Sequence, residues 1–321
     1  MTDIEYRFLD INGIRMRVAE QGRGPLVVLL HGFLNFSYSW RHQLQALAAA
    51  GYRAIAPDLR GYGGTDRPSD TAQYTQLHLA GDVVGLIDAY GGEPAVVAGH
   101  DWGAMVAWTT ALLRPDLVRG VVGMSVPYVP RGPHSLRAMM RERFGERHYI
   151  QYFQQPGLAD TELSADIAAT FRGVFHSGSG AAQTFWNPVL APEGRWLDAH
   201  PDPGTLPSWL SQAEFDAYVS AFSNTGFSGG LNYYRAIDAS WELMGAWTGA
   251  KIAVPAMFVY GDRDSFGNYA SDLIDALPQF VPQLRETVIL AGCGHWVQQE
   301  QPHEVSGALV RFAQATLPHG S

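Results

Sequence analysis

The chain has 321 residues, of which 46 % are apolar, enough to build one large α/β domain with an insertion, or two domains. Its 31 acidic and 22 basic side chains give a net charge of −9, and this acidic balance without a basic cluster argues against nucleic acid or an anionic membrane as a partner. The single cysteine, Cys293, excludes an intrachain disulfide and a metal cluster built on cysteines. The first residues include acids and no apolar segment typical of a signal peptide, and no apolar run could span a bilayer, so a soluble cytoplasmic protein is predicted.

Strand and helix signals alternate from residue 26 to residue 124. Short, continuous apolar runs are typical of strands that are buried on both faces, and apolar residues with helical spacing lie between them. The predicted strands cover residues 26–30, 52–56, 95–98 and 118–124, and the predicted helices cover 40–50, 79–90 and 102–113.

The pattern changes after Pro127. Residues 128–248 are rich in aromatic residues, glycine and proline, with helical stretches but no convincing buried strand, and residues 177–180 read as a short flexible patch. Strands return at 254–260 and 287–290, followed by a last helix around Leu309. We therefore predict a core domain of residues 1–127 and 249–321, with a mainly helical lid domain of residues 128–248 inserted into it.

Asp101 is the most informative residue. It lies at the centre of Gly99-His100-Asp101-Trp102-Gly103, between a predicted strand and a predicted helix, and this pattern is that of a nucleophile elbow. The usual serine would attack an acyl carbon. A carboxylate instead displaces at an alkyl carbon and forms an ester with the protein. The sequence therefore predicts cleavage of an alkyl–oxygen or alkyl–halide bond.

Partners for this nucleophile follow later strands in the expected order of acid and then histidine. His295 would take a proton from the water that hydrolyses the ester, and Asp264 would orient the imidazole. Asp262 is a rival for the role of Asp264. The backbone N–H groups of Trp102 and Phe33 are the candidate oxyanion donors.

Each of these residues also has an ordinary structural explanation. Gly-x-Asp-x-Gly can be a simple turn, Asp264 can cap a helix, and His31 and His100 are expected to pack beside the turns. The prediction depends on the combination, because three competent residues in the right order each follow a predicted strand.

Four motifs together resemble the α/β-hydrolase superfamily, specifically the soluble-type epoxide hydrolases, over nearly the whole chain. They are His31-Gly32-Phe33, residues 58–65, residues 100–103 and Gly294-His295-Trp296. The resemblance implies an α/β-hydrolase fold, with a mostly parallel eight-stranded sheet, flanking helices and a helical lid. The chain departs from the family at Leu34, where proline is usual, and over residues 176–210, which match no known family segment.

The lid distinguishes epoxide hydrolases from other enzymes with an aspartate nucleophile. Residues 149–157 and 231–235 look like the family segments that carry two lid tyrosines, and the matches fall on Tyr149 and Tyr234, with Tyr152 and Tyr233 as adjacent competitors. A phenol can protonate the alkoxide left by an opened epoxide, whereas a halide leaving group needs no proton.

The resulting expectation is an enzyme that hydrolyses a small apolar epoxide to a vicinal diol without a metal or organic cofactor. Trp186, Trp196 and Trp209 are possible walls of its pocket, and Trp186 is the candidate substrate contact. One alternative is a haloalkane or haloacid dehalogenase with Trp102 and Trp186 as halide donors, although Phe33 stands where haloalkane dehalogenases often have asparagine. A second alternative is a non-catalytic small-molecule receptor, which the complete set of catalytic residues disfavours.

Overall fold

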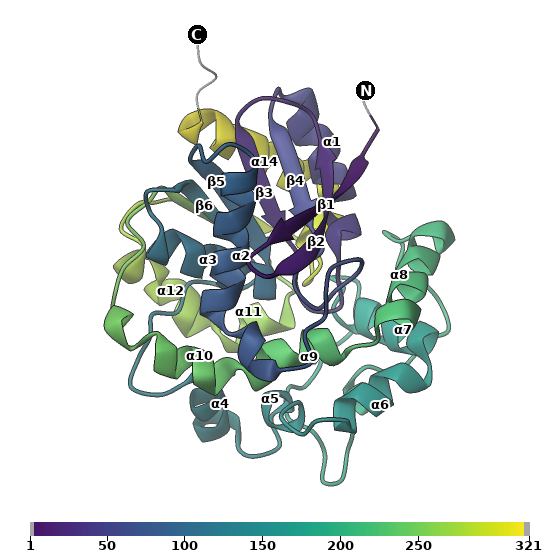
Figure 1. Ribbon diagram of the computed structural model, residues 1–321. Coiled ribbons are helices and arrows are strands. Elements are labelled where there is room, and N and C mark those ends of the chain that lie inside the picture. The colour runs from purple at the N-terminus through teal and green to yellow at the C-terminus, as the bar shows by residue number, and fades with distance from the viewer. Residues whose placement is uncertain (1–2, 318–321) are drawn as a thin grey trace.

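A mixed sheet of eight strands forms the centre of the protein (Figure 1). The computed structural model describes residues 3–317, apart from the side chains of residues 268 and 269. The strand order is β1-β2-β4-β3-β5-β6-β7-β8, and every pair from β4 to β8 is parallel. The strands are β1 (Glu5–Ile11), β2 (Ile14–Gln21), β3 (Leu26–Leu30), β4 (Arg53–Pro57), β5 (Ala95–His100), β6 (Val118–Met124), β7 (Ala256–Gly261) and β8 (Leu284–Leu290). The predicted mostly parallel sheet is confirmed.

The antiparallel hairpin β1–β2 is the part of the sheet that the sequence analysis did not locate. Its signal is present in the chain, because Asn12 and Gly13 connect the strands and both have positive φ, at 48° and 79°. An Asn-Gly pair between two strands is the strongest short hairpin signal. The exposed outer face of β1 obscures the alternation that would otherwise mark a strand.

Helices cover both faces of the sheet. Helices α1 (Arg41–Ala49) and α14 (Pro302–Thr316) pack on one face, and α2 (Gln76–Ala89), α3 (Trp102–Leu113) and α12 (Ser271–Phe280) pack on the other. In β3, Val27 and Leu29 pack on the face that α1 and α14 cover. Val28 and Leu30 pack on the opposite face, under α2, α3 and α12. This double burial explains why the parallel strands read as continuous apolar runs.

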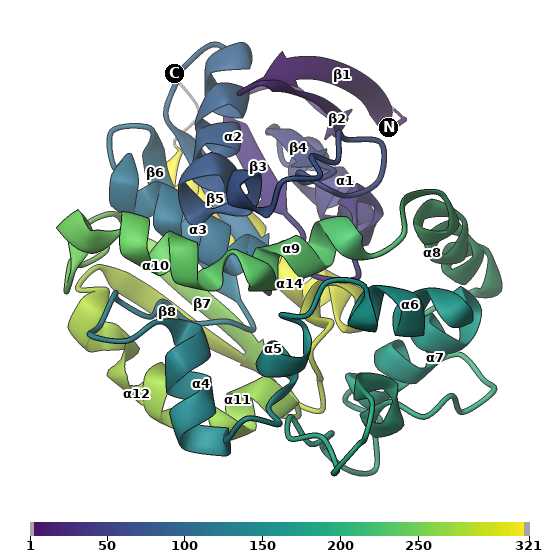
Figure 2. The same ribbon diagram turned by 60° about the horizontal axis from the view of Figure 1, so that its bottom comes forward.

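The chain between β6 and β7 forms a layer of helices at one end of the molecule (Figures 1 and 2). These helices are α4 (Leu136–Phe144), α5 (Tyr149–Tyr152), α6 (Leu158–Ala165), α7 (Ile167–Ser177), α8 (Gln212–Thr225), α9 (Ser228–Arg235) and α10 (Ile237–Leu243). The short helices α11 (Ser265–Tyr269) and α13 (Val297–Glu300) follow β7 and β8. The 3-10 turns are η1 (Ser37–Trp40), η2 (Thr71–Tyr74), η3 (Trp196–Ala199) and η4 (Gly245–Trp247).

None of the helices within residues 3–317 is long and apolar enough to cross a membrane.

Candidate active site

Asp101 occupies a strained turn between β5 and α3. Its φ of 54° is unusual for a residue with a side chain, and such strain is common at functional sites. The flanking glycines allow the turn, because a Cβ on Gly99 would lie 2.0 Å from the carbonyl oxygen of Gly103. A Cβ on Gly103 would lie 2.1 Å from the carbonyl oxygen of Leu30. The two small positions of the motif are thus required by close backbone packing.

Two backbone N–H groups bind the Asp101 carboxylate. Phe33 N–H donates to Oδ1 at 2.7 Å, and Trp102 N–H also hydrogen-bonds this side chain. Burial raises the pKa of the Asp101 carboxyl above its ordinary value, while nearby His295 and the two N–H donors reduce that increase. Both N–H groups expected from the sequence therefore reach the carboxylate.

His295 lies between the two aspartates. Its Nδ1 is 3.0 Å from Oδ2 of Asp264, and its Nε2 is 3.8 Å from Oδ2 of Asp101. Asp264 also accepts the Phe266 N–H at 3.0 Å, so it caps α11 and orients the imidazole at once. The rival Asp262 is exposed and accepts the backbone N–H of Gly292 at 2.7 Å instead.

The carboxylates around His295 raise its pKa to about 9. Burial alone would lower this pKa, but the charge and hydrogen bond of Asp264 and the charges of Asp101 and Glu300 outweigh it. The imidazole is therefore protonated at neutral pH while Asp101 carries its charge. Removal of that charge would lower the pKa of His295 toward neutrality.

The backbone of His295 is fixed from three sides. Its N–H donates to the Gly178 carbonyl at 2.7 Å, and its carbonyl accepts Nε2–H of His100 at 2.7 Å and the Ser125 hydroxyl at 3.0 Å. His100 is fully buried, in line with the structural role expected for it. No sequence motif marked Ser125.

Residues 177–180 were expected to be flexible, and that expectation is wrong in the structure. A Cβ on Gly180 would lie 2.0 Å from the carbonyl oxygen of Gly292, so this patch packs against the loop that carries His295. Glu300 joins the two segments, since its carboxylate accepts the N–H groups of Gly180 and Gly294 at 2.8 and 3.2 Å. Glu300 follows the histidine in no recognised sequence pattern, so no motif predicted this role.

Tyr149, on α5, and Tyr234, on α9, lie beside each other and close to the nucleophile. Their side chains are hydrogen-bonded together, and Tyr234 is also hydrogen-bonded to the side chain of Trp102, whose indole can only donate. Burial, followed by neighbouring groups that include the Asp101 charge, raises the pKa of both phenols. They therefore remain protonated donors at neutral pH.

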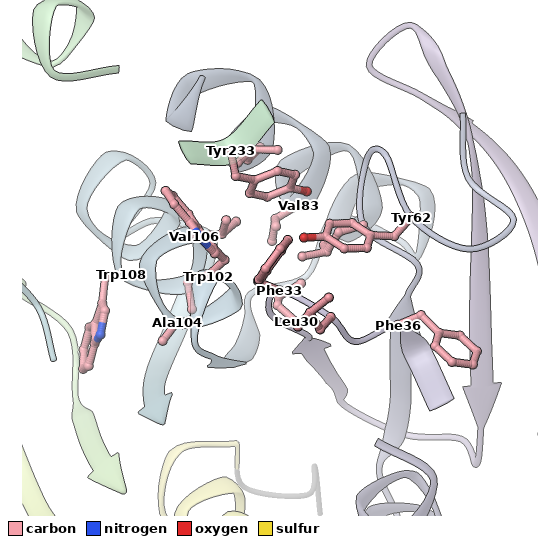
Figure 3. Packing of buried hydrophobic residues seen from close by; sticks show 14 of the residues in the cluster. Leu30, Phe33, Phe36, Tyr62, Val83, Trp102, Ala104, Val106, Trp108 and Tyr233 are labelled. Carbon is pink, nitrogen blue, oxygen red and sulfur yellow. The ribbon is translucent and has the colours of Figure 1, made fainter. Parts of the chain in front are cut away.

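The competing tyrosines point elsewhere. Tyr152 donates to Glu162 at 2.7 Å, and Tyr233 donates to the backbone carbonyl of Arg60 at 2.9 Å. Figure 3 shows Tyr233 packed with Trp102 and Phe33 in the core, where its ring lies 5.6 Å from that of Trp102.

Two cavities meet at the nucleophile. The larger has a volume of about 200 Å³ and the smaller about 70 Å³, and both are lined by Asp101, Tyr149, Tyr234 and Phe266. The larger is mainly apolar, with Met105, Trp108, Leu112, Val126 and Met139 among its walls. The smaller contains Phe33, Leu34, Trp186, Trp196, Asp264 and His295.

The three tryptophans considered as pocket walls behave differently. Trp186 and Trp196 line the smaller cavity, and the Trp186 ring lies 5.5 Å from that of Tyr149. Trp209 instead packs edge-on against Phe175 and donates to the Ser179 hydroxyl at 3.1 Å. The segment 176–210 thus supplies walls of the site without resembling a known motif.

Histidine, cysteine and carboxylate side chains of the described part of the chain form no group of three or more that could hold a metal ion.

Comparison with known proteins gives the same assignment as the geometry. The family model described as "alpha/beta hydrolase fold" matches residues 25–302. The chain is 44 % identical to "Epoxide hydrolase A" of Mycobacterium tuberculosis (strain ATCC 25618 / H37Rv), covering 95 % of this chain and 96 % of that protein. It is 42 % identical to "Epoxide hydrolase 3" of Siraitia grosvenorii, covering 97 % and 99 %.

A solved structure is similar over the whole fold. The "Epoxide hydrolase from an endophytic Streptomyces" superimposes with a TM-score of 0.93 at 41 % identity, covering 98 % of this chain and 96 % of that one. The chain therefore belongs to the α/β-hydrolase family and, within it, to the epoxide hydrolases.

Proposed function

We propose that this epoxide hydrolase converts an apolar epoxide to a vicinal diol through an ester on Asp101. One observation carries the proposal: the Asp101 carboxylate and the phenols of Tyr149 and Tyr234 line the same space, with His295 beside the carboxylate. A nucleophile, acid groups for the ring oxygen and a base for the second step are thus all present.

In the first step, Oδ2 of Asp101 attacks one ring carbon, and the bond from that carbon to the ring oxygen breaks. Oδ1 is the oxygen held by Phe33 N–H, so it becomes the ester carbonyl oxygen. The ring oxygen leaves as an alkoxide and takes a proton from Tyr149 or Tyr234. The Trp102 hydrogen bond to Tyr234 helps to stabilise the phenolate that remains.

In the second step, water attacks the ester carbonyl carbon. Ester formation has removed the Asp101 charge, so the pKa of His295 falls and the imidazole gives up its proton, which passes through solvent to the phenolate and restores the tyrosine. Nε2 can then accept a proton from water. Negative charge then develops on Oδ1, where the N–H groups of Phe33 and Trp102 stabilise it. The intermediate collapses with cleavage of the Cγ–Oδ2 bond, and the leaving oxygen takes the proton from His295 to complete the diol. The Asp101 carboxyl group, which keeps one oxygen atom from water, then returns its proton to His295.

The two cavities support a substrate with substituents on both sides of the ring. The larger, mainly apolar cavity suits the bulkier group, and the smaller one, beside Trp186 and Trp196, suits a smaller group and the attacking water. We further propose that residues 128–248 act as the lid over a core of 1–127 and 249–321, and that the enzyme works in the cytoplasm without a metal or organic cofactor.

The dehalogenase alternative has less support. A halide site would use the indole N–H of Trp102, which is hydrogen-bonded to Tyr234. Two buried phenols would have no role in dehalogenation, because a halide leaving group needs no proton. Parallel assays with styrene oxide and a 1-haloalkane separate the two reactions, and halide release without diol formation would overturn the proposal.

One turnover in ¹⁸O-labelled water tests the ester mechanism directly. We expect the label in the peptide that contains Asp101 and an unlabelled diol from the first turnover, because the protein supplies the first oxygen. A second turnover of the washed enzyme in ordinary water should then release labelled diol. Label that enters the first diol directly would show that water attacks the ring without an ester.

A further inference from the structure

The loop that carries Phe33 turns sharply at Leu34. Asn35 N–H donates to the Gly32 carbonyl at 3.2 Å, so residues 32–35 form a β-turn with Phe33 and Leu34 at its centre. Leu34 has a φ of 59°, in the left-handed region where glycine and asparagine are favoured at this turn position. Leucine therefore occupies a position that its own side chain disfavours.

This turn is in direct contact with the nucleophile. Phe33, at the first central position, donates its N–H to Oδ1 of Asp101 at 2.7 Å. A Cβ on Gly32 would lie 2.4 Å from that same oxygen, so the backbone of the turn touches the carboxylate. A small change in the turn therefore changes the direction of the Phe33 N–H.

The surroundings hold the turn at both ends. At its start, the Gly32 carbonyl also accepts Nδ1–H of His31 at 2.9 Å, and Nε2 of His31 accepts the Leu59 N–H at 2.9 Å. At its end, the fully buried Asn35 side chain accepts the hydroxyl of Tyr218 at 3.1 Å. Strained residues persist where neighbouring structure fixes them in this way.

Proline, which the family pattern leads one to expect here, has its φ locked at about −65° and cannot adopt the conformation of Leu34. We propose that the left-handed backbone of Leu34, and not its side chain, is a positioning element that directs the Phe33 N–H at Asp101. This inference rests on the proposed function, because it assigns Phe33 to the oxyanion site.

The Phe33 N–H acts differently on the two steps of the reaction. Ester formation removes negative charge from Asp101, so the Phe33 N–H stabilises the start of that step more than its end. Ester hydrolysis places negative charge on Oδ1, so the same donor accelerates it. A misdirected N–H should slow the second step selectively, whereas a general packing defect would alter both steps and substrate binding.

Four substitutions separate the backbone of Leu34 from its side chain. Leu34→Gly and Leu34→Ala both remove the side chain, while Leu34→Val and Leu34→Pro disfavour or forbid a positive φ. Single turnovers of styrene oxide, quenched and analysed by mass spectrometry of the Asp101 peptide, give rate constants for ester formation and hydrolysis.

We expect Leu34→Val and Leu34→Pro to hydrolyse the ester at least about 10-fold more slowly than Leu34→Ala, since a lost oxyanion donor typically costs more than that. Their rates of ester formation should stay within about three-fold of the alanine variant, so the ester should accumulate. Leu34→Gly should melt at a higher temperature than Leu34→Ala, the reverse of their usual order, because glycine accepts a positive φ without strain.

Ester hydrolysis in Leu34→Val at the rate of Leu34→Ala would overturn the inference, and this variant decides the matter even where the proline variant does not fold. Equal slowing in Leu34→Ala and Leu34→Val would assign the effect to the side chain and also overturn it. A lack of ¹⁸O label in the Asp101 peptide after one wild-type turnover in labelled water is a different result, which would refute the proposed function itself.

Discussion

Replacement of Asp101 by asparagine should lower the pKa of His295, and this tests whether the nucleophile's charge controls the base. Nε2 of His295 lies 3.8 Å from Oδ2 of Asp101, and both side chains are 18 % exposed. At an effective dielectric constant of about 20, two charges at that distance interact by about 4 kcal/mol, equal to about three pKa units, and water reduces this. Asp264, whose Oδ2 lies 3.0 Å from Nδ1 of His295, is retained in the variant. We therefore expect the pKa of His295 to fall from about 9 to between about 6 and 8.

NMR titration of protein labelled with ¹³C in its histidine rings measures this change, with His295→Gln used to assign the signal. Asp262→Asn is the matched control, because Asp262 lies on the Asp264 loop but contacts the Gly292 backbone instead of the imidazole. The control should leave the pKa of His295 in place. A pKa that is equally high in Asp101→Asn would refute the reasoning, because ester formation could then not release the base.

Three further predictions follow from the same geometry. His295→Gln should form the ester but not hydrolyse it, so its intact mass should rise by the mass of the epoxide; an unmodified protein after turnover would contradict the assigned base. Tyr149→Phe and Tyr234→Phe should each slow ester formation by about 10²-fold, as expected for a lost proton donor, whereas Tyr152→Phe, whose hydroxyl binds Glu162, should change it less than about two-fold in rapid-quench assays. Because folding raises the pKa of His295 from 6.5 to about 9, its protonation should stabilise the wild type over His295→Gln by about 3 kcal/mol below pH 6.5. That advantage should disappear as the pH rises from 6.5 to 9, and denaturant unfolding with no such trend would contradict the raised pKa.

Local patterns determined much of this protein. The glycines around Asp101 predicted the elbow, because only small residues allow a strand, a tight turn and a helix to pack so closely. Continuous apolar runs predicted the parallel strands, since both faces of that sheet are covered. Asn12-Gly13 also carried the hairpin signal, although the exposed outer face of β1 hid the strand beside it. In each case, the signal lies within the same short stretch of sequence as the element that it predicts.

The site itself depended on contacts between distant parts of the chain. His100 and His295 are joined by a hydrogen bond across 195 positions, and no local pattern specifies such a distance. Composition suggested that residues 177–180 are flexible, yet Gly178 binds the His295 backbone. Motif alignment ranked Tyr149 above Tyr152, but only the fold shows which hydroxyl has a partner outside the cavity.

Sequence alone thus determined the type of nucleophile and the turn that presents it, because both depend on side-chain chemistry and on backbone conformations available to neighbouring residues. Tertiary structure decided the pKa of His295, the division of the site into two cavities and the left-handed backbone of Leu34. Those properties arise from burial, packing, hydrogen bonds and charges that join groups far apart in the chain, and they exist only once the chain has folded.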